Sequence, residues 1–356
     1  MPNVHVSAVD LALVNTIYSP TRARQPWILQ DVLPEGATRY YSLARWALVD
    51  ALRTYGVGPG DRVLVPGLIC REVIASISLL GATAVFYPVS RDLCAELSAD
   101  DLGQVKAVIA VNYFGFPQDL GVFRDYCQNT GAALIEDNAH GFLSRDEHGQ
   151  LLGSRGDAGV FSLRKTIAVP DGGVLVLTGD RGMPKTLVSR KANAGSARYR
   201  LKQAFRRMAG RLGPRRTHRV ISGTRQLRCV LAGDGHPAGA QDAEIRIPIG
   251  PSASSLFVHP LSVAEPSVEV HRRRALYELA DRITGAIGAV SVFPCLPSNV
   301  VPYGFPMFVS QARLVETIAE VERYGFQISK WPELPTAVAT EAPEHYRYLM
   351  VLPFLW

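Results

Sequence analysis

The strongest signal for the fold is the stretch ALIEDNAHGFLSRDEHGQLLGSRGDAGVFSLRKTIAVPDGGVLVL, residues 133–177. Together with Ala132 just before it, this stretch forms short apolar runs at 132–135, 158–161 and 174–177, of a kind typical of strands buried on both faces of a sheet. Polar residues adjoin each run: Glu136 and Asp137 follow the first, Ser162 and Lys165 follow the second, and 171–173 precede the third. An acid, a hydroxyl and an amine just past strand ends indicate a site at the carboxyl edge of an α/β sheet.

The segments before this stretch continue the same alternation. Apolar runs predict strands, and amphipathic or capped segments predict helices between them, so we expect a mainly parallel sheet. The expected strands are 62–65, 83–88 and 105–112, and the expected helices are 40–55, 71–80, 98–104 and 120–130.

The motifs EDNAH at 136–140, GSRGDAGVFS at 153–162 and PDGG at 170–173, with Lys165 between the last two, resemble the DegT/DnrJ/EryC1/StrS sugar aminotransferases. These are pyridoxal phosphate (PLP) enzymes of the aspartate aminotransferase fold type, fold type I. The resemblance covers residues 39–178 well and the C-terminal third loosely. It implies an α/β fold with a large, mainly parallel-sheet domain and a smaller C-terminal α/β domain.

The resemblance also implies roles for individual side chains. Lys165 matches the lysine that holds PLP covalently and then moves protons at the substrate carbon. Asp137 matches the carboxylate that keeps the pyridine nitrogen protonated. Glu136 suits that role less, because adjacent strand residues face opposite ways. His140 matches a residue beside the ring, and Ser162 matches a serine that binds the cofactor phosphate.

Each of these residues also has an ordinary structural interpretation. Lys165 could be a solvated loop lysine, Asp137 a turn cap, and Ser162 a plain strand-end hydroxyl. His140 could equally be a structural histidine.

The sequence departs from the family pattern in places. Leu43-Ala44-Arg45 stands where relatives have a Ser-Gly-Thr turn for the phosphate, so Arg45 could bind the phosphate through its guanidinium instead. Near Cys70 there is no aromatic residue to stack on the PLP ring, so the ring must pack against Cys70 or a residue elsewhere. We find no Asn-Tyr-Arg element. These departures keep two alternatives open: other PLP chemistry or a non-sugar substrate, and a non-catalytic relative that acts as a binding partner.

The predicted organisation has an N-terminal arm at 1–38, a large PLP-binding domain at 39–250 and a small domain at 251–356. For the small domain we expect a long helix within 262–287, a strand at 300–309 and a helix at 311–324. The loop at 330–335 resembles a family loop near the active site.

A basic segment interrupts the large domain at 181–228. It holds 15 Lys and Arg and no Asp or Glu, whereas the rest of the chain holds 23 basic and 32 acidic residues. Within it, 198–212 predicts a helix with an apolar face made by Leu201, Phe205, Met208 and Leu212. The segment could be a solvated surface, or could contact a phosphate-bearing substrate, an acidic protein or an anionic membrane. We expect no nucleic acid, because no recognised motif accompanies the charge.

Composition and motifs exclude other classes. There is no GxGxxG or Walker loop, no apolar run long enough to span a membrane, and no basic region of a secretory signal at the N-terminus. The five cysteines are scattered without a CxxC pair, which favours reduced thiols in a cytoplasm and no metal site. The family resemblance implies a homodimeric PLP-dependent aminotransferase. It also implies glutamate as the amino donor and a keto group of a nucleotide sugar or related intermediate as the acceptor.

Overall fold

The computed structural model describes residues 5–97, 103–178, 195–217, 219–221, 223, 242–253, 257 and 259–355. Its largest element is a seven-stranded sheet with the order β2-β8-β7-β6-β5-β3-β4. All strands run parallel except β8, which is antiparallel to both of its neighbours. The strands are β2 (Ala37–Tyr41), β8 (Gly173–Leu177), β7 (Ala158–Ser162), β6 (Ala133–Asn138), β5 (Ala107–Val111), β3 (Arg62–Pro66) and β4 (Thr83–Tyr87). The predicted mainly parallel sheet is confirmed.

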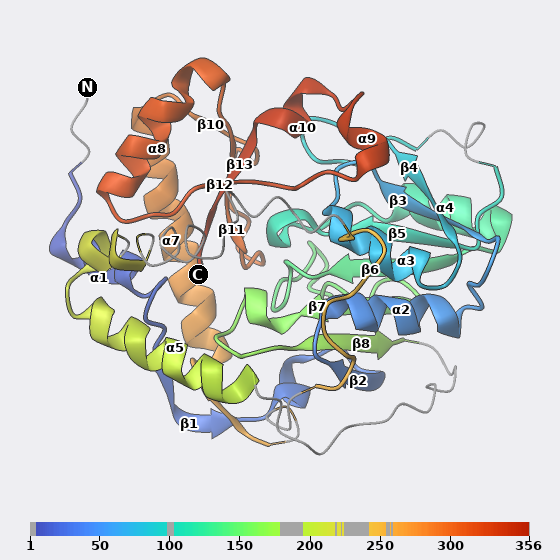
Figure 1. Cartoon of the computed structure of the whole chain (residues 1–356), viewed down its shortest axis with the longest axis horizontal. Coiled ribbons are helices and arrows are strands. Elements are labelled where there is room, and N and C mark those ends of the chain that lie inside the picture. Colours follow the sequence, from blue (N-terminus) through green and yellow to red (C-terminus); the bar gives the residue numbers. More distant parts are fainter. Residues whose placement is uncertain are drawn as a thin grey trace.

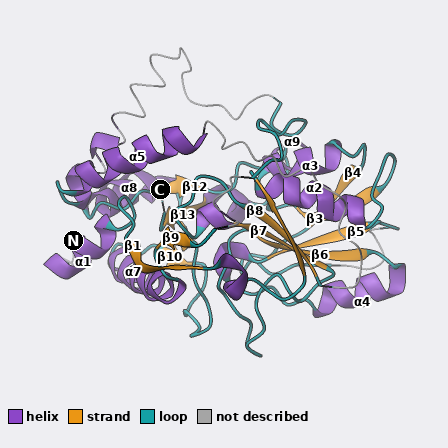
Figure 2. Cartoon of the chain, turned by 90° about the horizontal axis from the view of Figure 1, so that it is seen from below, coloured by secondary structure: helices purple, strands orange, loops and turns teal. Residues whose placement is uncertain are grey.

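Helices cover both faces of this sheet, which explains the apolar runs of its central strands. Helices α2 (Ala44–Thr54) and α3 (Ile74–Ser78) lie on one face, and α4 (Gly121–Thr130) lies on the other (Figure 2). Every residue of β5, β7 and β8 is buried as a result.

A second, smaller sheet lies at the other side of the molecule (Figure 1). Its strands are all antiparallel, in the order β10-β11-β13-β12. The strands are β10 (Val290–Ser291), β11 (Gly304–Phe308), β13 (Leu349–Pro353) and β12 (Ser329–Lys330). The long helix α7 (Pro266–Ala286) packs on β10 and β11, and α8 (Leu314–Arg323) packs on α7. The short helices α9 (Thr336–Ala339) and α10 (Glu344–Tyr348) precede β13.

The N-terminal region is more ordered than its weak sequence pattern indicates. Helix α1 (Ala8–Asn15) starts with a capping box between Ser7 and Asp10, and it packs against α7. Strand β1 (Arg22–Trp27) pairs with β9 (Leu261–Val263). The predicted boundary after residue 38 falls inside β2, and the domain limits stay a prediction.

One predicted helix starts later than expected, and another falls largely outside the described residues. The helix predicted at 40–55 starts only at Ala44, because Tyr40 and Tyr41 are hydrogen-bonded into β2. That part of the prediction is wrong. The helix predicted near 98–104 falls largely on residues outside the described ranges.

Helix α5 (Gly195–Gly210) is the described core of the basic segment; residues 181–194, 218, 222 and 224–228 lie outside the described ranges. A helix forms as predicted, but of its four apolar face residues only Phe205 is partly buried and packs against the core. Leu201, Met208 and Leu212 are exposed, whereas Arg206 is only 4% exposed. The helix therefore turns most of its predicted apolar face outward.

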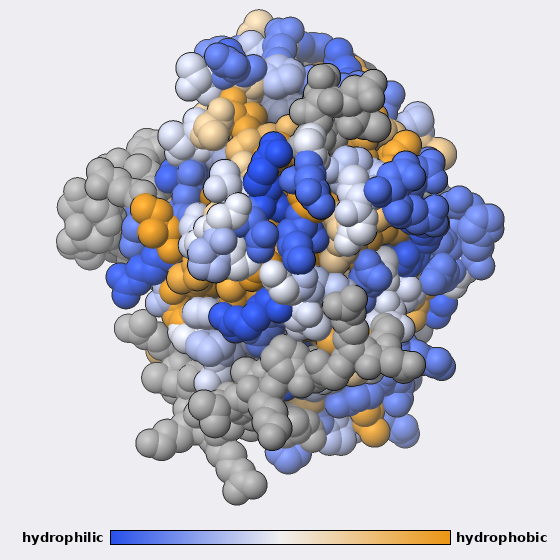
Figure 3. Space-filling view, turned by 90° about the vertical axis from the view of Figure 1, so that its right-hand side faces the viewer, coloured by the Kyte–Doolittle hydropathy of each residue, from blue (hydrophilic) through white to orange (hydrophobic). Residues whose placement is uncertain are grey.

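The side of the molecule that carries α4 is mostly hydrophilic, with hydrophobic side chains in small separate groups (Figure 3). In the described part of the chain, no helix combines the length and the apolarity needed to cross a membrane.

Candidate active site

A cavity of about 230 Å³ opens at the carboxyl ends of the central parallel strands, where the sequence predicts a site. Val111 of β5, Asp137 of β6 and Ser162 of β7 line its floor. The other predicted site residues also line it: Ala44, Arg45, Cys70, His140 and Lys165. The structure therefore brings all the predicted residues together; their roles stay predictions.

Glu136 and Asp137, adjacent residues near the end of β6, face opposite sides of the sheet, as alternation along a strand requires. Asp137 faces the cavity, and one of its oxygens accepts a hydrogen bond of 2.9 Å from the Ala139 amide. Burial raises the pKa of Asp137, and the nearby Lys165 and the Ala139 amide oppose this effect. Glu136 is fully buried and accepts bonds from the Asn112 side chain at 2.7 Å and the Gly153 amide at 2.6 Å.

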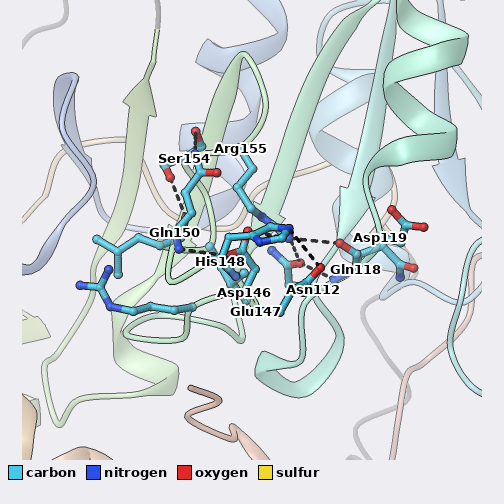
Figure 4. Close-up of polar contacts among 12 residues, drawn as sticks. Asn112, Gln118, Asp119, Asp146, Glu147, His148, Gln150, Ser154 and Arg155 are labelled. Atoms are coloured by element: carbon cyan, nitrogen blue, oxygen red, sulfur yellow. Dashed lines mark hydrogen bonds and ion pairs between the residues drawn. The ribbon is translucent and has the colours of Figure 1, made fainter. Parts of the chain in front are cut away.

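Arg155 holds the strand ends in place around Glu136. Its guanidinium donates to Glu136 at 3.0 Å. It also donates to the Asn112 side chain at 2.9 Å and to the Gln118 carbonyl at 3.2 Å (Figure 4). This buried network anchors Glu136 and so fixes which way the next residue, Asp137, points. Arg155 belongs to the GSRGDAGVFS motif, but the sequence analysis assigns it no role.

Lys165 and His140 meet inside the cavity, with Nζ and Nε2 3.0 Å apart. The Phe114 amide lies 3.4 Å from His140 Nδ1 and can only donate, so Nδ1 accepts. A neutral imidazole then carries its proton on Nε2 and donates it to an unprotonated lysine amine. Burial lowers the pKa of both groups, in agreement with a neutral pair.

Aromatic rings surround His140. The imidazole stacks on Tyr303 at 4.3 Å and on Phe114 at 5.5 Å, and Trp331 lies 5.3 Å away. Trp331 belongs to the loop predicted near the site, and it lines the cavity together with Tyr303. Cys70 is a wall residue, and burial raises the pKa of its thiol to about 12. The sequence analysis missed Tyr303, which lies in an irregular segment without a motif.

Arg273 of α7 joins the Lys165 segment to the small sheet. It is fully buried and donates to the carbonyls of Lys165 at 2.9 Å and Thr166 at 2.7 Å. It also donates to the Tyr303 carbonyl at 3.0 Å and to Glu269 at 2.6 Å. Burial lowers the pKa of Arg273 to about 10, and Glu269 opposes this effect. Sequence reasoning missed this residue, because it is one arginine of the helical run at 271–274.

The N-terminus of α2 forms the polar end of the cavity. No side chain caps it at Leu43, and a Cβ at Gly173 would collide with the Leu43 carbonyl and the Ala44 amide. Glycine is therefore required where β8 passes this helix start. Ser162 and Arg164 line the cavity beside Arg45. Partial burial lowers the pKa of Arg164, and the positive charge of Arg45 lowers it further. Helix dipole, free amides and two guanidiniums together suit an anion.

Comparison with solved structures identifies the fold. The aminotransferase TlmJ from Streptoalloteichus hindustanus is 18% identical, with a TM-score of 0.57 over 96% of this chain and 84% of that one. A 3-amino-5-hydroxybenzoic acid (AHBA) synthase is 15% identical, with a TM-score of 0.55 over 89% and 80% of the two chains. The putative sugar aminotransferase Spr1654 from Streptococcus pneumoniae, in its PLP form, is 16% identical, with a TM-score of 0.54 over 100% and 93%. The fold is that of PLP-dependent aminotransferases.

Residues 43–213 match the model of the DegT/DnrJ/EryC1/StrS aminotransferase family. Nearly half of the chain is therefore similar to this family. The matched range includes every predicted site residue and ends just past α5.

Proposed function

We propose that this aminotransferase uses PLP in the cavity described above, with glutamate as amino donor and a keto group on a nucleotide sugar or related intermediate as acceptor. The observation that carries the proposal is the convergence of Asp137, His140 and Lys165 on one buried cavity at the carboxyl edge of the sheet. When bound, PLP carries the amino group and withdraws electrons from the reacting carbon.

The residues present fit this cofactor. Asp137 is a buried carboxylate with a raised pKa, and a protonated ring nitrogen supplies the positive charge that such a group needs. At the other end, no described residue hydrogen-bonds the Ser162 hydroxyl, which is 4% exposed and lines the cavity. That hydroxyl, the start of α2 and Arg45 suit the phosphate.

The remaining residues prepare the lysine for its work. His140 donates to the Lys165 amine and keeps it oriented, and burial lowers the pKa of that amine, which favours its neutral, nucleophilic form. The neutral lysine can then take a proton from the substrate carbon and return it. Tyr303 and Trp331 exclude water from this side of the cavity.

Other parts of the proposal follow from the family resemblance or from composition. A homodimer is the family's assembly, and the acceptor's diphosphate gives the guanidiniums near the cavity a second anion to bind. The scattered cysteines support a reducing compartment such as the cytoplasm; the four that the structure describes are free, and Cys229 lies outside the described ranges.

Purified protein incubated with PLP tests the cofactor assignment. We expect an absorbance band of lysine-bound PLP, lost on borohydride reduction with the added mass on Lys165. Mass on another lysine, or no bound PLP, would contradict the assignment. Loss of the band on adding glutamate, with 2-oxoglutarate formed, then tests the donor.

A non-sugar acceptor is the second candidate, because the AHBA synthase matches this chain with a TM-score of 0.55, against 0.54 for the putative sugar aminotransferase Spr1654. A set of nucleotide keto-sugars and cyclic ketones offered to the glutamate-loaded enzyme separates the two. A protein that binds PLP but converts neither glutamate nor other amino acids would support the binding-partner alternative.

A further inference from the structure

A row of exposed apolar side chains runs along the outer side of α5. Leu201 is 73% exposed, Met208 is 62% exposed, and Leu212, just past the helix end, is 49% exposed. Spacings of seven and four residues place all three on one side of a helix. Soluble proteins normally turn such a row inward, so its exposure calls for an explanation.

The opposite side of α5 attaches the helix to the protein mainly through polar or small residues, and the partly buried Phe205 adds an apolar contact with the core. Gln203, Arg206 and Gly210 are its buried described residues, and their spacing of three and four puts them on one side. The Asn15 side chain of α1 donates to the Gly210 carbonyl at 2.8 Å. The helix is thus held by this side and by Phe205, and it presents Leu201, Met208 and Leu212 to the surroundings.

Basic residues border the exposed row. Lys202 lies on one flank, and Arg207 and Arg211 lie on the other; all three are exposed. No Asp or Glu occurs from 181 to 228, so no acidic residue of this segment offsets the charge. An apolar row with cationic flanks is the pattern of helices that lie in the interface of an anionic lipid bilayer.

We propose that the outer side of α5, defined by Leu201, Met208 and Leu212 with Lys202, Arg207 and Arg211, binds the surface of anionic lipid membranes. The apolar row enters the boundary between headgroups and acyl chains, and the basic flanks contact the lipid phosphates. In both views of the ribbon, α5 lies toward the edge of the described part of the molecule (Figures 1 and 2). This proposal does not depend on the cofactor or on the acceptor.

A second copy of the chain fits this surface less well. A two-fold contact through α5 would bring the same arginines against one another, and no acidic residue of the segment would neutralise them. A single helical row is also small beside the roughly 800 Å² per partner of a standard protein interface. A bilayer needs neither a shaped pocket nor that area.

The test measures co-flotation of the full-length protein with vesicles of phosphatidylcholine alone and with vesicles that contain 30% phosphatidylserine. We expect binding to the anionic vesicles only, weakened as salt rises. Leu201→Gln/Met208→Gln should lower the partition coefficient about tenfold or more, because glutamine keeps the helix but removes the apolar contact. Arg207→Gln/Arg211→Gln should lower it about fivefold per charge. The matched control Leu79→Gln/Val122→Gln removes two exposed apolar residues on α4 and at the end of α3, and should bind like the wild type.

Circular dichroism and the thermal midpoint verify that each variant is folded. Equal flotation with both vesicle types, or unchanged binding of the Leu201/Met208 variant, would overturn the proposal. So would the absence of vesicle binding together with an oligomer that the Leu201/Met208 variant dissociates, since the surface would then join copies of the chain. Binding of an acidic protein but not of vesicles would likewise replace the lipid with a protein partner.

Discussion

Arg273→Met should destabilise the protein and also loosen the segment that carries Lys165. The guanidinium donates to Glu269 and to the carbonyls of Pro302, Tyr303, Lys165 and Thr166, over distances of 2.6 to 3.0 Å. Methionine fills a similar volume but donates nothing, so these acceptors lose their partner in a fully buried place.

The size of the effect follows from what Glu269 retains. Removing one partner of a buried ion pair costs about 3–5 kcal/mol. Glu269 keeps the Arg272 guanidinium, whose Nε lies 2.9 Å from Oε2, so we expect the lower end, about 3 kcal/mol. That is roughly a hundredfold in the unfolding equilibrium. Arg273→Lys keeps the charge but offers fewer donors, and should fall between the methionine variant and the wild type.

Urea unfolding followed by fluorescence measures the free energy, and stopped-flow absorbance measures the rate at which Lys165 captures PLP. The control is Arg274→Met on the same helix, because Arg274 is only half-buried and bonds the carbonyls of Pro297 and Val300, remote from Lys165. We expect a loss below about 1 kcal/mol and an unchanged capture rate for the control. Equal behaviour of the two methionine variants would refute the positioning role of Arg273.

Further predictions concern the cavity. Lys165→Ala should fold normally but bind PLP reversibly, so mass spectrometry after borohydride should find no label; a label elsewhere contradicts the assignment. Asp137→Asn should cut turnover by several orders of magnitude with PLP still bound, because an amide holds no proton on the ring nitrogen. Glu136→Gln should chiefly lower stability in a melting experiment. If Glu136→Gln instead abolished turnover and Asp137→Asn only lowered stability, Glu136 would be the residue at the ring nitrogen. Burial lowers the pKa of Lys165 from its usual 10.5, so PLP capture should stay fast below pH 10.5 and slow only as pH falls through the lowered pKa; a pH profile centred at 10.5 would contradict this. Arg45→Ala/Arg164→Ala should weaken PLP about tenfold or more in a fluorescence titration and leave pyridoxal, which lacks the phosphate, unchanged; equal losses would remove the arginines from the phosphate site.

The parts of the site that local sequence determines were predictable. Strand alternation separates Glu136 from Asp137, and the structure has Asp137 at the cavity and Glu136 in the Arg155 network. The order of the parallel strands then brings Ser162 to the same edge. These inferences need only the period of a strand and the direction of a parallel sheet.

The parts that depend on distant segments were not predictable from the residues. Arg273 donates to the Lys165 carbonyl across 108 positions of sequence. Tyr303, which follows α7 in the chain, stacks on His140. Nothing in their own neighbourhoods marks them, because an arginine on a helix and a tyrosine in a loop are usually solvated or structural.

The orientation of α5 shows a different limit. Periodicity correctly predicts that Leu201, Met208 and Leu212 share one side, but it cannot say which side meets the protein. The choice depends on the surface available, here Asn15 and its surroundings on α1, which bond the Gly210 carbonyl. A row of apolar residues in the sequence therefore predicts that this side of the helix contacts something. The structure shows Leu201, Met208 and Leu212 exposed, so the described part of the protein does not provide that contact.

Residues from the large sheet and from segments next to the small sheet line the cavity together. The large sheet supplies Asp137 and Ser162, whereas Tyr303 and Trp331 come from segments that flank strands of the small sheet. Arg273 spans the junction, since it bonds the Lys165 and Tyr303 carbonyls at once. A substitution that weakens this junction will therefore change the placement of the lysine amine and the aromatic wall together. A substitution that changes only the lysine amine or only the aromatic wall acts instead through a contact inside the cavity.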